Sequence, residues 1–65
     1  SGNRIFARSL FVVEEIKKGD ALGLSNVRSI RPGHGLPPKE LESILGRRAK
    51  LDIARGTPLS WELID

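Results

Sequence analysis

Hydrophobic and polar residues follow one another in short blocks along this chain. Leu10 to Val13 form a β-prone apolar run bounded by charged residues, which predicts a strand within residues 8–16. Residues 17–20 then predict a tight turn, in which Gly19 suits a positive φ and Asp20 bonds to the local backbone. The first twenty residues therefore predict one strand that ends in one turn.

The next block mixes strand and turn signals. Ser25 is predicted to cap a single helical turn that holds Asn26 and Val27, and residues 28–30 predict a second short strand. Regular structure is expected to stop there, because glycines and a proline follow in quick succession: Pro32, Gly33 and Gly35.

One segment has a helical period. The pattern predicts a helix over residues 37–45, since proline suits a first helical position and Leu41, Ile44 and Leu45 share one apolar face. Gly46 supplies the expected stop.

The last block resembles the first. Residues 49–53 predict a strand and residues 54–57 a second turn, and Ser60 is predicted to cap a closing turn that carries Trp61 and Ile64. The whole pattern predicts a compact, mostly β domain with short helices and little regular structure.

This likeness is an internal repeat. Residues 14–27 match residues 51–64 at a shift of 37 positions. Apolar, acidic, basic and glycine positions coincide, in the pairs Ile16/Ile53, Gly19/Gly56, Leu22/Leu59, Glu15/Asp52, Lys18/Arg55, Leu24/Trp61 and Val27/Ile64. Two copies of one unit predict a fold with internal pseudo-twofold symmetry, and the unrepeated residues 28–48 become the place to look for function.

Composition limits the possibilities further. The 65 residues allow one small domain without cysteine, and its net charge of +3 is spread over interleaved acids and bases. The interleaved charges make a nucleic acid an unexpected partner. No apolar run reaches the roughly 20 residues of a membrane helix, so no membrane is expected as a partner either. The absence of cysteine fits a cytoplasmic location, which we expect. We expect the domain to span residues 4–65, with residues 1–3 as a linker or vector remnant.

The residues assemble no catalytic constellation. His34 is the only histidine, and neither Asp52 nor the serines at positions 29, 43 and 60 have a spacing that recommends a triad. Gly33-His34-Gly35 lacks the GK[ST] ending of a phosphate-binding loop. We therefore expect no catalytic residue and no metal ligand in this domain.

The best functional candidate is Arg31, followed by Pro32 and Gly33. Proline restricts the backbone of the arginine before it, and the glycines let the loop pass close to another surface. A guanidinium so presented offers a planar fork of donors to a carboxylate, phosphate or amide carbonyl. The alternative is a tight turn in which Arg31 pairs with a local acid.

Several segments together resemble a known family. They are RSLFVV at 8–13, IKKG at 16–19, NVRSIRPGHG at 26–35, GRRA at 46–49 and DIARGTPLSW at 52–61. The chain resembles a SAF, or antifreeze-like, domain, and more narrowly the C-terminal domain of bacterial sialic acid synthases, including the pseudaminic and legionaminic acid branch.

The resemblance implies a β-clip fold and a parent enzyme with an N-terminal barrel. That barrel would hold a divalent metal and condense phosphoenolpyruvate with an N-acylated amino sugar. The small domain would cover the barrel of the partner subunit in a homodimer, and Arg31 would contact the acylamino group of the sugar. No cofactor is implied in the small domain itself.

Two other functions stay open at this stage. The same fold serves as an ice-binding protein, so a stand-alone ice- or carbohydrate-binding module is the main alternative, although Glu14, Lys17, Lys18 and Asp20 place charge on the matching stretch. A weak nucleic-acid binder would use Arg47, Arg48, Lys50 and Arg55, but stacking aromatic residues are missing from that region.

Overall fold

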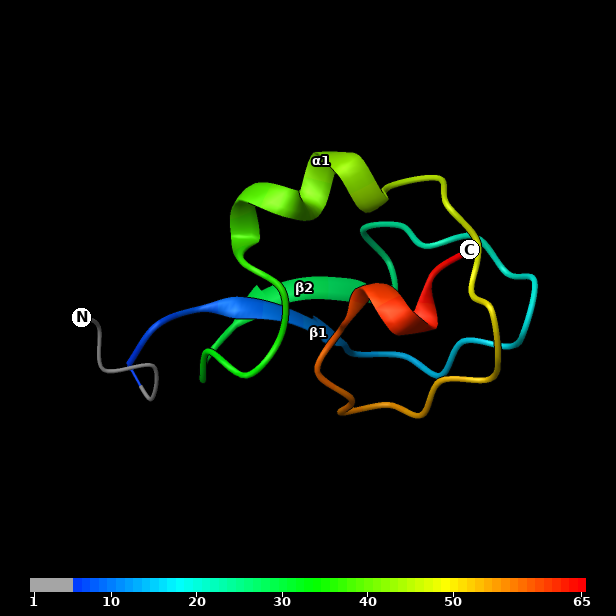
Figure 1. The fold of residues 1–65 in the computed structure, drawn as a ribbon. Coiled ribbons are helices and arrows are strands. Elements are labelled where there is room, and N and C mark those ends of the chain that lie inside the picture. Colours follow the sequence, from blue (N-terminus) through cyan, green and yellow to red (C-terminus); the bar gives the residue numbers. More distant parts are fainter. Residues whose placement is uncertain (1–5) are drawn as a thin grey trace.

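The computed structural model describes residues 6–65, so the expected linker at residues 1–3 lies outside the described residues. Two antiparallel strands lie at its centre, β1 (Ser9–Val12) and β2 (Val27–Ile30) (Figure 1). Their register pairs Ser9 with Ile30 at one end and Val12 with Val27 at the other. All four residues of β1 are buried, whereas β2 alternates in burial, so β1 is the inner strand. The strands predicted within residues 8–16 and at residues 28–30 are confirmed, the first of them over Ser9–Val12 alone.

The two predicted turns have the same geometry. Gly19 and Gly56 each have φ of 90°, a conformation that favours glycine. In each turn an amide bonds back three residues, from Asp20 to the Lys17 carbonyl at 2.9 Å and from Thr57 to the Ala54 carbonyl at 3.2 Å. A carboxylate oxygen of Asp20 also accepts from the Lys17 amide at 3.2 Å, as the sequence predicted.

The predicted helix is shorter than expected. A 3₁₀ turn, η1 (Pro38–Glu40), leads into one turn of α-helix, α1 (Leu41–Ile44), which lies above the sheet in Figure 1. Pro37 stays extended, with ψ of 148°, because the proline that follows it disfavours helical backbone. Leu45 also leaves the helix, with ψ of 130°, ahead of Gly46 at φ 86°.

Three smaller predictions were wrong. Residues 49–53 form no strand, because Ala49 and Ile53 make isolated bridges to different partners, Ile64 and Ile16. The Asn26 side chain, and not Ser25, closes the turn before β2 by accepting from the Gly23 amide at 2.9 Å. The closing 3₁₀ turn, η2 (Trp61–Leu63), follows Ser60, but no backbone amide of the turn donates to the Ser60 hydroxyl.

The core is built largely from equivalent positions of the repeat. Its buried cluster consists of Leu10, Val12, Ile16, Leu22, Val27, Ile44, Ala49, Ile53, Leu59 and Ile64, with Leu36, Leu41 and Leu63 packed against it. The equivalent positions Leu24 and Trp61 are both on the surface, 64% and 43% exposed. Equivalent positions of the two copies are therefore alike in burial, whether they are buried or exposed. Aliphatic packing closes the domain without a disulfide.

Backbone hydrogen bonds also come in matched pairs. Gly19 donates to the Ala49 carbonyl and Gly56 to the Val12 carbonyl, and a shift of 37 residues exchanges these two bonds. The same shift relates the bond from Leu22 to Arg47 with that from Leu59 to Leu10, and the bond from Val13 to Asn26 with that from Lys50 to Leu63.

Candidate functional site

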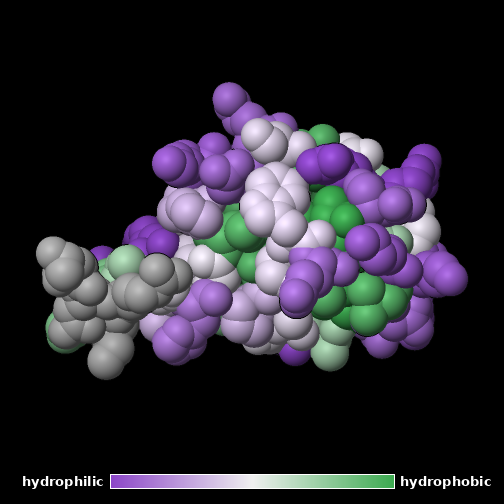
Figure 2. Space-filling view, in the orientation of Figure 1, coloured by the Kyte–Doolittle hydropathy of each residue, from purple (hydrophilic) through white to green (hydrophobic). Residues whose placement is uncertain are grey.

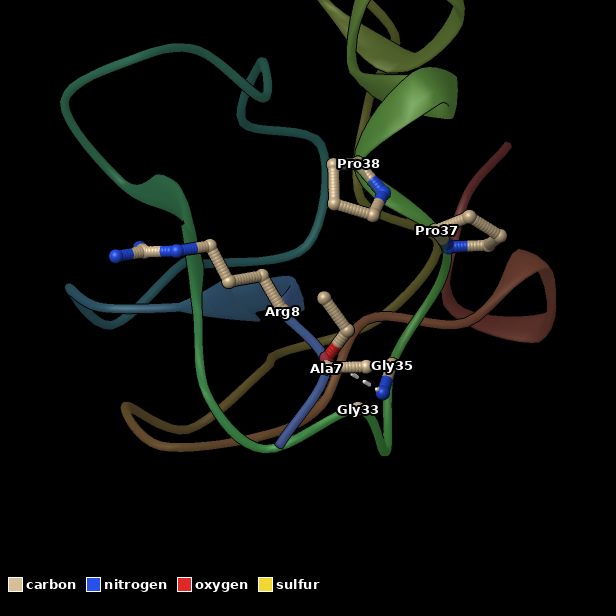
Figure 3. A pocket seen from close by; sticks show the side chains of 7 residues that line it. Ala7, Arg8, Gly33, Gly35, Pro37 and Pro38 are labelled. Carbon is tan, nitrogen blue, oxygen red and sulfur yellow. Dashed lines mark hydrogen bonds between the residues drawn. The ribbon is translucent and has the colours of Figure 1, made fainter. Parts of the chain in front are cut away.

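The candidate site is the loop of residues 31–37, which joins β2 to η1 and passes back along the start of β1 (Figure 3). Ile30 pairs with Ser9 just before the loop. At its far end, the Leu36 carbonyl accepts from the Leu10 amide, and the Leu36 amide donates to the Leu59 carbonyl, both at 2.9 Å. Both ends of the loop are therefore fixed to the same inner strand.

The Ser9 side chain forms hydrogen bonds to both sides of this loop. Its hydroxyl donates to the Pro32 carbonyl at 2.7 Å and accepts from the Gly35 amide at 2.9 Å. Ser9 is 1% exposed and is the buried polar side chain among the described residues. Ser9 could not be singled out from the sequence, because a lone serine at the start of an apolar strand carries no signal of its tertiary partners.

Gly35 lies so close to β1 that only glycine fits. A Cβ at this position would overlap the carbonyl oxygen of Leu10 and lie 3.0 Å from the Leu59 amide nitrogen. The expectation that a loop glycine permits close approach to another surface is thus met at Gly35, and that surface is the backbone of the domain itself.

Arg31 is exposed at the start of the loop, directly after the last residue of β2. Its Nε donates to the carbonyl of Phe6 at 3.0 Å, and its peptide bond to Pro32 is cis. Within residues 6–65 its partner is this carbonyl and not an acid, so the pairing with a local acid that the sequence left open is not found. Among the described residues this bond is made by Nε, and the guanidinium has two terminal NH₂ groups as further donors for a ligand.

A small hollow of about 160 Å³ adjoins the loop. It is lined by Ala7, Arg8, Ser9, Gly33, Gly35, Pro37 and Pro38. Figure 3 shows the Arg8 side chain pointing away from Pro37 and Gly35, and its Nη1 donates to the Ser29 carbonyl at 3.1 Å. The wall of the hollow is therefore mainly backbone and proline. His34 is exposed beside it, and nothing assigns it a role.

The remaining candidates form no second site in the part of the chain that the structure describes. No group of three or more His, Asp or Glu side chains is placed to hold a metal ion there. Of the basic residues considered for nucleic acid, Arg48 donates to the Gly19 carbonyl at 2.8 Å and Arg47 stacks 5.5 Å over the Trp61 ring. Those two guanidiniums are thus already engaged within the domain.

Comparison with known families decides the relationship. The profile described as SAF domain matches residues 7–65. The chain belongs to the SAF domain family. Its matched region contains both strands, the Arg31 loop and both copies of the repeat, so the family resemblance seen in the sequence is confirmed.

The relatives of this SAF domain are parts of longer proteins. Pseudaminic acid synthase of Helicobacter pylori is 47% identical over 62 residues, which cover 95% of this chain and 18% of the relative. The chain thus spans less than a fifth of the length of that relative.

Solved structures agree with the assigned fold. Spore coat polysaccharide biosynthesis protein spsE of Bacillus subtilis is 37% identical and matches with a TM-score of 0.84, covering 95% of this SAF domain and 19% of that chain. An antifreeze protein like domain from the human N-acetylneuraminic acid phosphate synthase gene is 18% identical and also has a TM-score of 0.84, covering 98% of this chain and 82% of that one. This last likeness concerns the fold alone.

Hydropathy adds one finding on the described part of the SAF domain. None of its helices is long and apolar enough to cross a membrane.

Proposed function

We propose that this chain is the C-terminal, substrate-capping domain of a sialic-acid-type synthase. The observation that carries the proposal is the 47% identity, over 95% of the chain, to a pseudaminic acid synthase. In the parent enzyme, an N-terminal barrel would condense phosphoenolpyruvate with an N-acylated amino sugar. The SAF domain would cover the barrel of the partner subunit in a homodimer, exclude water and order the substrate.

Within this proposal Arg31 contacts the acylamino group of the sugar. The guanidinium suits that task because its Nε donates to the Phe6 carbonyl, while the residue as a whole is exposed and keeps two terminal NH₂ groups as further donors. An amide carbonyl accepts two of these donors in one plane, which a lysine ammonium does not reproduce. Pro32 restricts the backbone of Arg31, and Gly33 lets the loop pass close to another surface.

The chemical step belongs to the barrel in this proposal. The family resemblance implies a divalent metal, and the proposal assigns it to that barrel. The contribution of this chain is binding and orientation, which raises the fraction of bound substrate in reactive geometry.

We also infer that the two halves of the domain are related by the pseudo-twofold symmetry of a β-clip. The matched hydrogen bonds from Gly19 and Gly56, which a shift of 37 residues exchanges, support this inference. The equal φ of the two glycines supports it as well. A measured structure in which residues 14–27 do not superpose on residues 51–64 would contradict it.

A stand-alone ice-binding module is the weaker candidate. Ice binding in this fold needs a flat and rather apolar face, whereas Glu14, Lys17, Lys18 and Asp20 are all exposed. On the face seen in Figure 2, hydrophobic patches are separated by hydrophilic side chains. Charged groups keep their hydration, so we expect no inhibition of ice recrystallisation by the 65-residue chain.

The deciding experiment is an assay of the intact synthase with phosphoenolpyruvate and a panel of mono- and di-N-acetylated hexosamines. Turnover that disappears when this domain is removed, and returns when it is added back as a fusion, is the expected result. Full turnover without the domain would overturn the capping function. Ice recrystallisation inhibition by the isolated chain would instead favour the module.

A further inference from the structure

The Ser9 hydroxyl lies where the two sides of the Arg31 loop come together. It bonds to Pro32, the residue after the arginine, and to Gly35, the residue at which the loop meets β1. A hydroxyl has one proton to donate and two lone pairs, so a single small side chain serves a carbonyl and an amide at once. Ser9 thus closes the loop across residues 32–35.

The surroundings of Ser9 make these bonds consequential. The Ser9 side chain and its bond from the Gly35 amide are buried, so that amide has little access to water once the hydroxyl is removed, and the bond to the Pro32 carbonyl is half-buried. Gly35 cannot move closer to β1, because the space between its Cα and the Leu10 carbonyl is already too small for a Cβ atom. Loss of the hydroxyl is therefore relieved by movement of the loop away from the strand.

That movement would displace Arg31. The arginine is joined directly to Pro32, and within residues 6–65 its guanidinium is held by the bond from Nε to the Phe6 carbonyl at 3.0 Å. A backbone shift at Pro32 changes both the position of the Arg31 Cα and the reach of this bond. The placement of the guanidinium thus depends on the hydroxyl of a residue in β1.

We propose that Ser9 is the positioning residue of the Arg31 loop, which sets the guanidinium for the acylamino group of the sugar. The proposal rests on the function proposed above and deepens it. Ser9 touches neither substrate nor reacting atoms; it acts through Pro32 and Arg31. Its hydroxyl, and not its volume, is what the site requires.

The first test needs no ligand and uses the 65-residue chain. In Ser9→Ala we expect the Gly35 amide to exchange with deuterium about tenfold faster relative to the Leu59 amide of the same molecule. Leu59 donates to the Leu10 carbonyl and reports on β1 and global stability. The Arg31 Nε–H should exchange faster as well. An unchanged ratio of the Gly35 and Leu59 amide exchange rates would overturn the proposal.

A second variant separates the hydroxyl from packing. Ser9→Thr keeps the hydroxyl and adds a methyl group to a buried site, so it should lower Tm yet keep the wild-type ratio of Gly35 to Leu59 exchange. Equal loosening of Gly35 in both variants would assign Ser9 a packing role and overturn the proposal. If Ser9→Ala does not fold, fast exchange of Gly35 in the wild-type chain or in Ser9→Thr has the same consequence.

The last test uses the intact synthase and the hexosamine that it turns over best. Ser9→Ala should raise the KM for the sugar about tenfold and leave the KM for phosphoenolpyruvate unchanged, and it should add little to Arg31→Ala in the double variant. Ile53→Val, a core variant whose backbone bridge is to Ile16 and not to the loop, serves as the control for lowered stability and should leave both constants alone.

The outcomes distinguish the two proposals. If Gly35 and the Arg31 Nε–H loosen in Ser9→Ala but Arg31→Ala leaves sugar kinetics unchanged, the role of Arg31 fails while the hydroxyl still positions the loop. If Arg31→Ala impairs sugar use and Ser9→Ala does not, Ser9 is not the positioning residue.

Discussion

Ile16 and Ile53 occupy the same position in the two copies of the repeat, and they face each other in an antiparallel bridge. Their backbones exchange two hydrogen bonds, from the Ile16 amide at 2.9 Å and from the Ile53 amide at 2.7 Å. Both side chains are buried in the same core cluster. The two copies therefore meet at their own equivalent residues, and this contact leads to the first prediction.

Substitution of these isoleucines should be coupled. Each of Ile16→Val and Ile53→Val should lower the free energy of unfolding by about 0.5–1.5 kcal/mol, since each removes one buried methylene. Because the residues are paired, the double variant should depart from the sum of the single effects by about 0.5 kcal/mol or more. Urea unfolding of the four proteins measures this, and strict additivity would contradict direct coupling across the bridge.

The two turn glycines should have the same cost of replacement. Gly19→Ala and Gly56→Ala should each destabilise the domain by about 1–2 kcal/mol, because both residues have φ of 90° and open space around them. The cost is conformational and not steric, so it should be alike at both sites. Thermal unfolding checks this, and a large difference between the two variants would show that the turns are not equivalent.

Gly35→Ala should destabilise the domain for a different reason. Its Cβ would overlap the Leu10 carbonyl, so the loop or β1 must move, at a cost of about 1–3 kcal/mol. Gly23→Ala is the matched control, because Gly23 has no heavy atom within 4 Å of an added Cβ and no positive φ. Equal midpoints of urea unfolding for the two variants would refute the close approach at Gly35.

Arg31→Ala should impair sugar use in the intact synthase without loss of folding. Removal of a charged donor to the acylamino carbonyl should raise the KM for the sugar about 10- to 100-fold. Arg31→Lys should recover little of this, because an ammonium lacks the planar fork. Steady-state kinetics with each substrate varied is the measurement.

Arg55→Ala provides the control for Arg31. Arg55 is also exposed, but it lies in the second turn, away from the loop in sequence. Its replacement should leave the KM for the sugar unchanged and remove the same formal charge. If both variants raise the KM alike, the effect comes from general electrostatics and not from a contact made by Arg31.

Several features could be predicted because they depend on neighbours in sequence. The strand at Leu10 to Val12, the glycine turns at 19 and 56 and the break after β2 all follow from local propensity. The helix was predicted too long at its start, because Pro38 keeps Pro37 extended. The prediction gave more weight to the apolar period around Leu41 than to this local effect of proline. The strand at 49–53 was wrong because its ends pair with different segments.

The candidate site divides in the same way. Arg31, Pro32 and Gly33 could be singled out from the sequence, since their residue types are unusual in one loop and match a family motif. Ser9 could not, because its importance arises from partners 23 and 26 residues away in the chain. The bond from Arg31 to the Phe6 carbonyl is likewise tertiary, and it replaced the local acid that the sequence allowed.

The sequence by itself determined the repeat, the apolar set that fills the core, the turn positions and the family, because these reside in residue type and spacing. Only the tertiary structure decided that the two copies meet at Ile16 and Ile53, that Gly35 presses on Leu10 and that Ser9 holds the loop of Arg31. The physical reason is that hydrogen bonds and close approaches between distant segments depend on register and distance, which emerge only when the core closes.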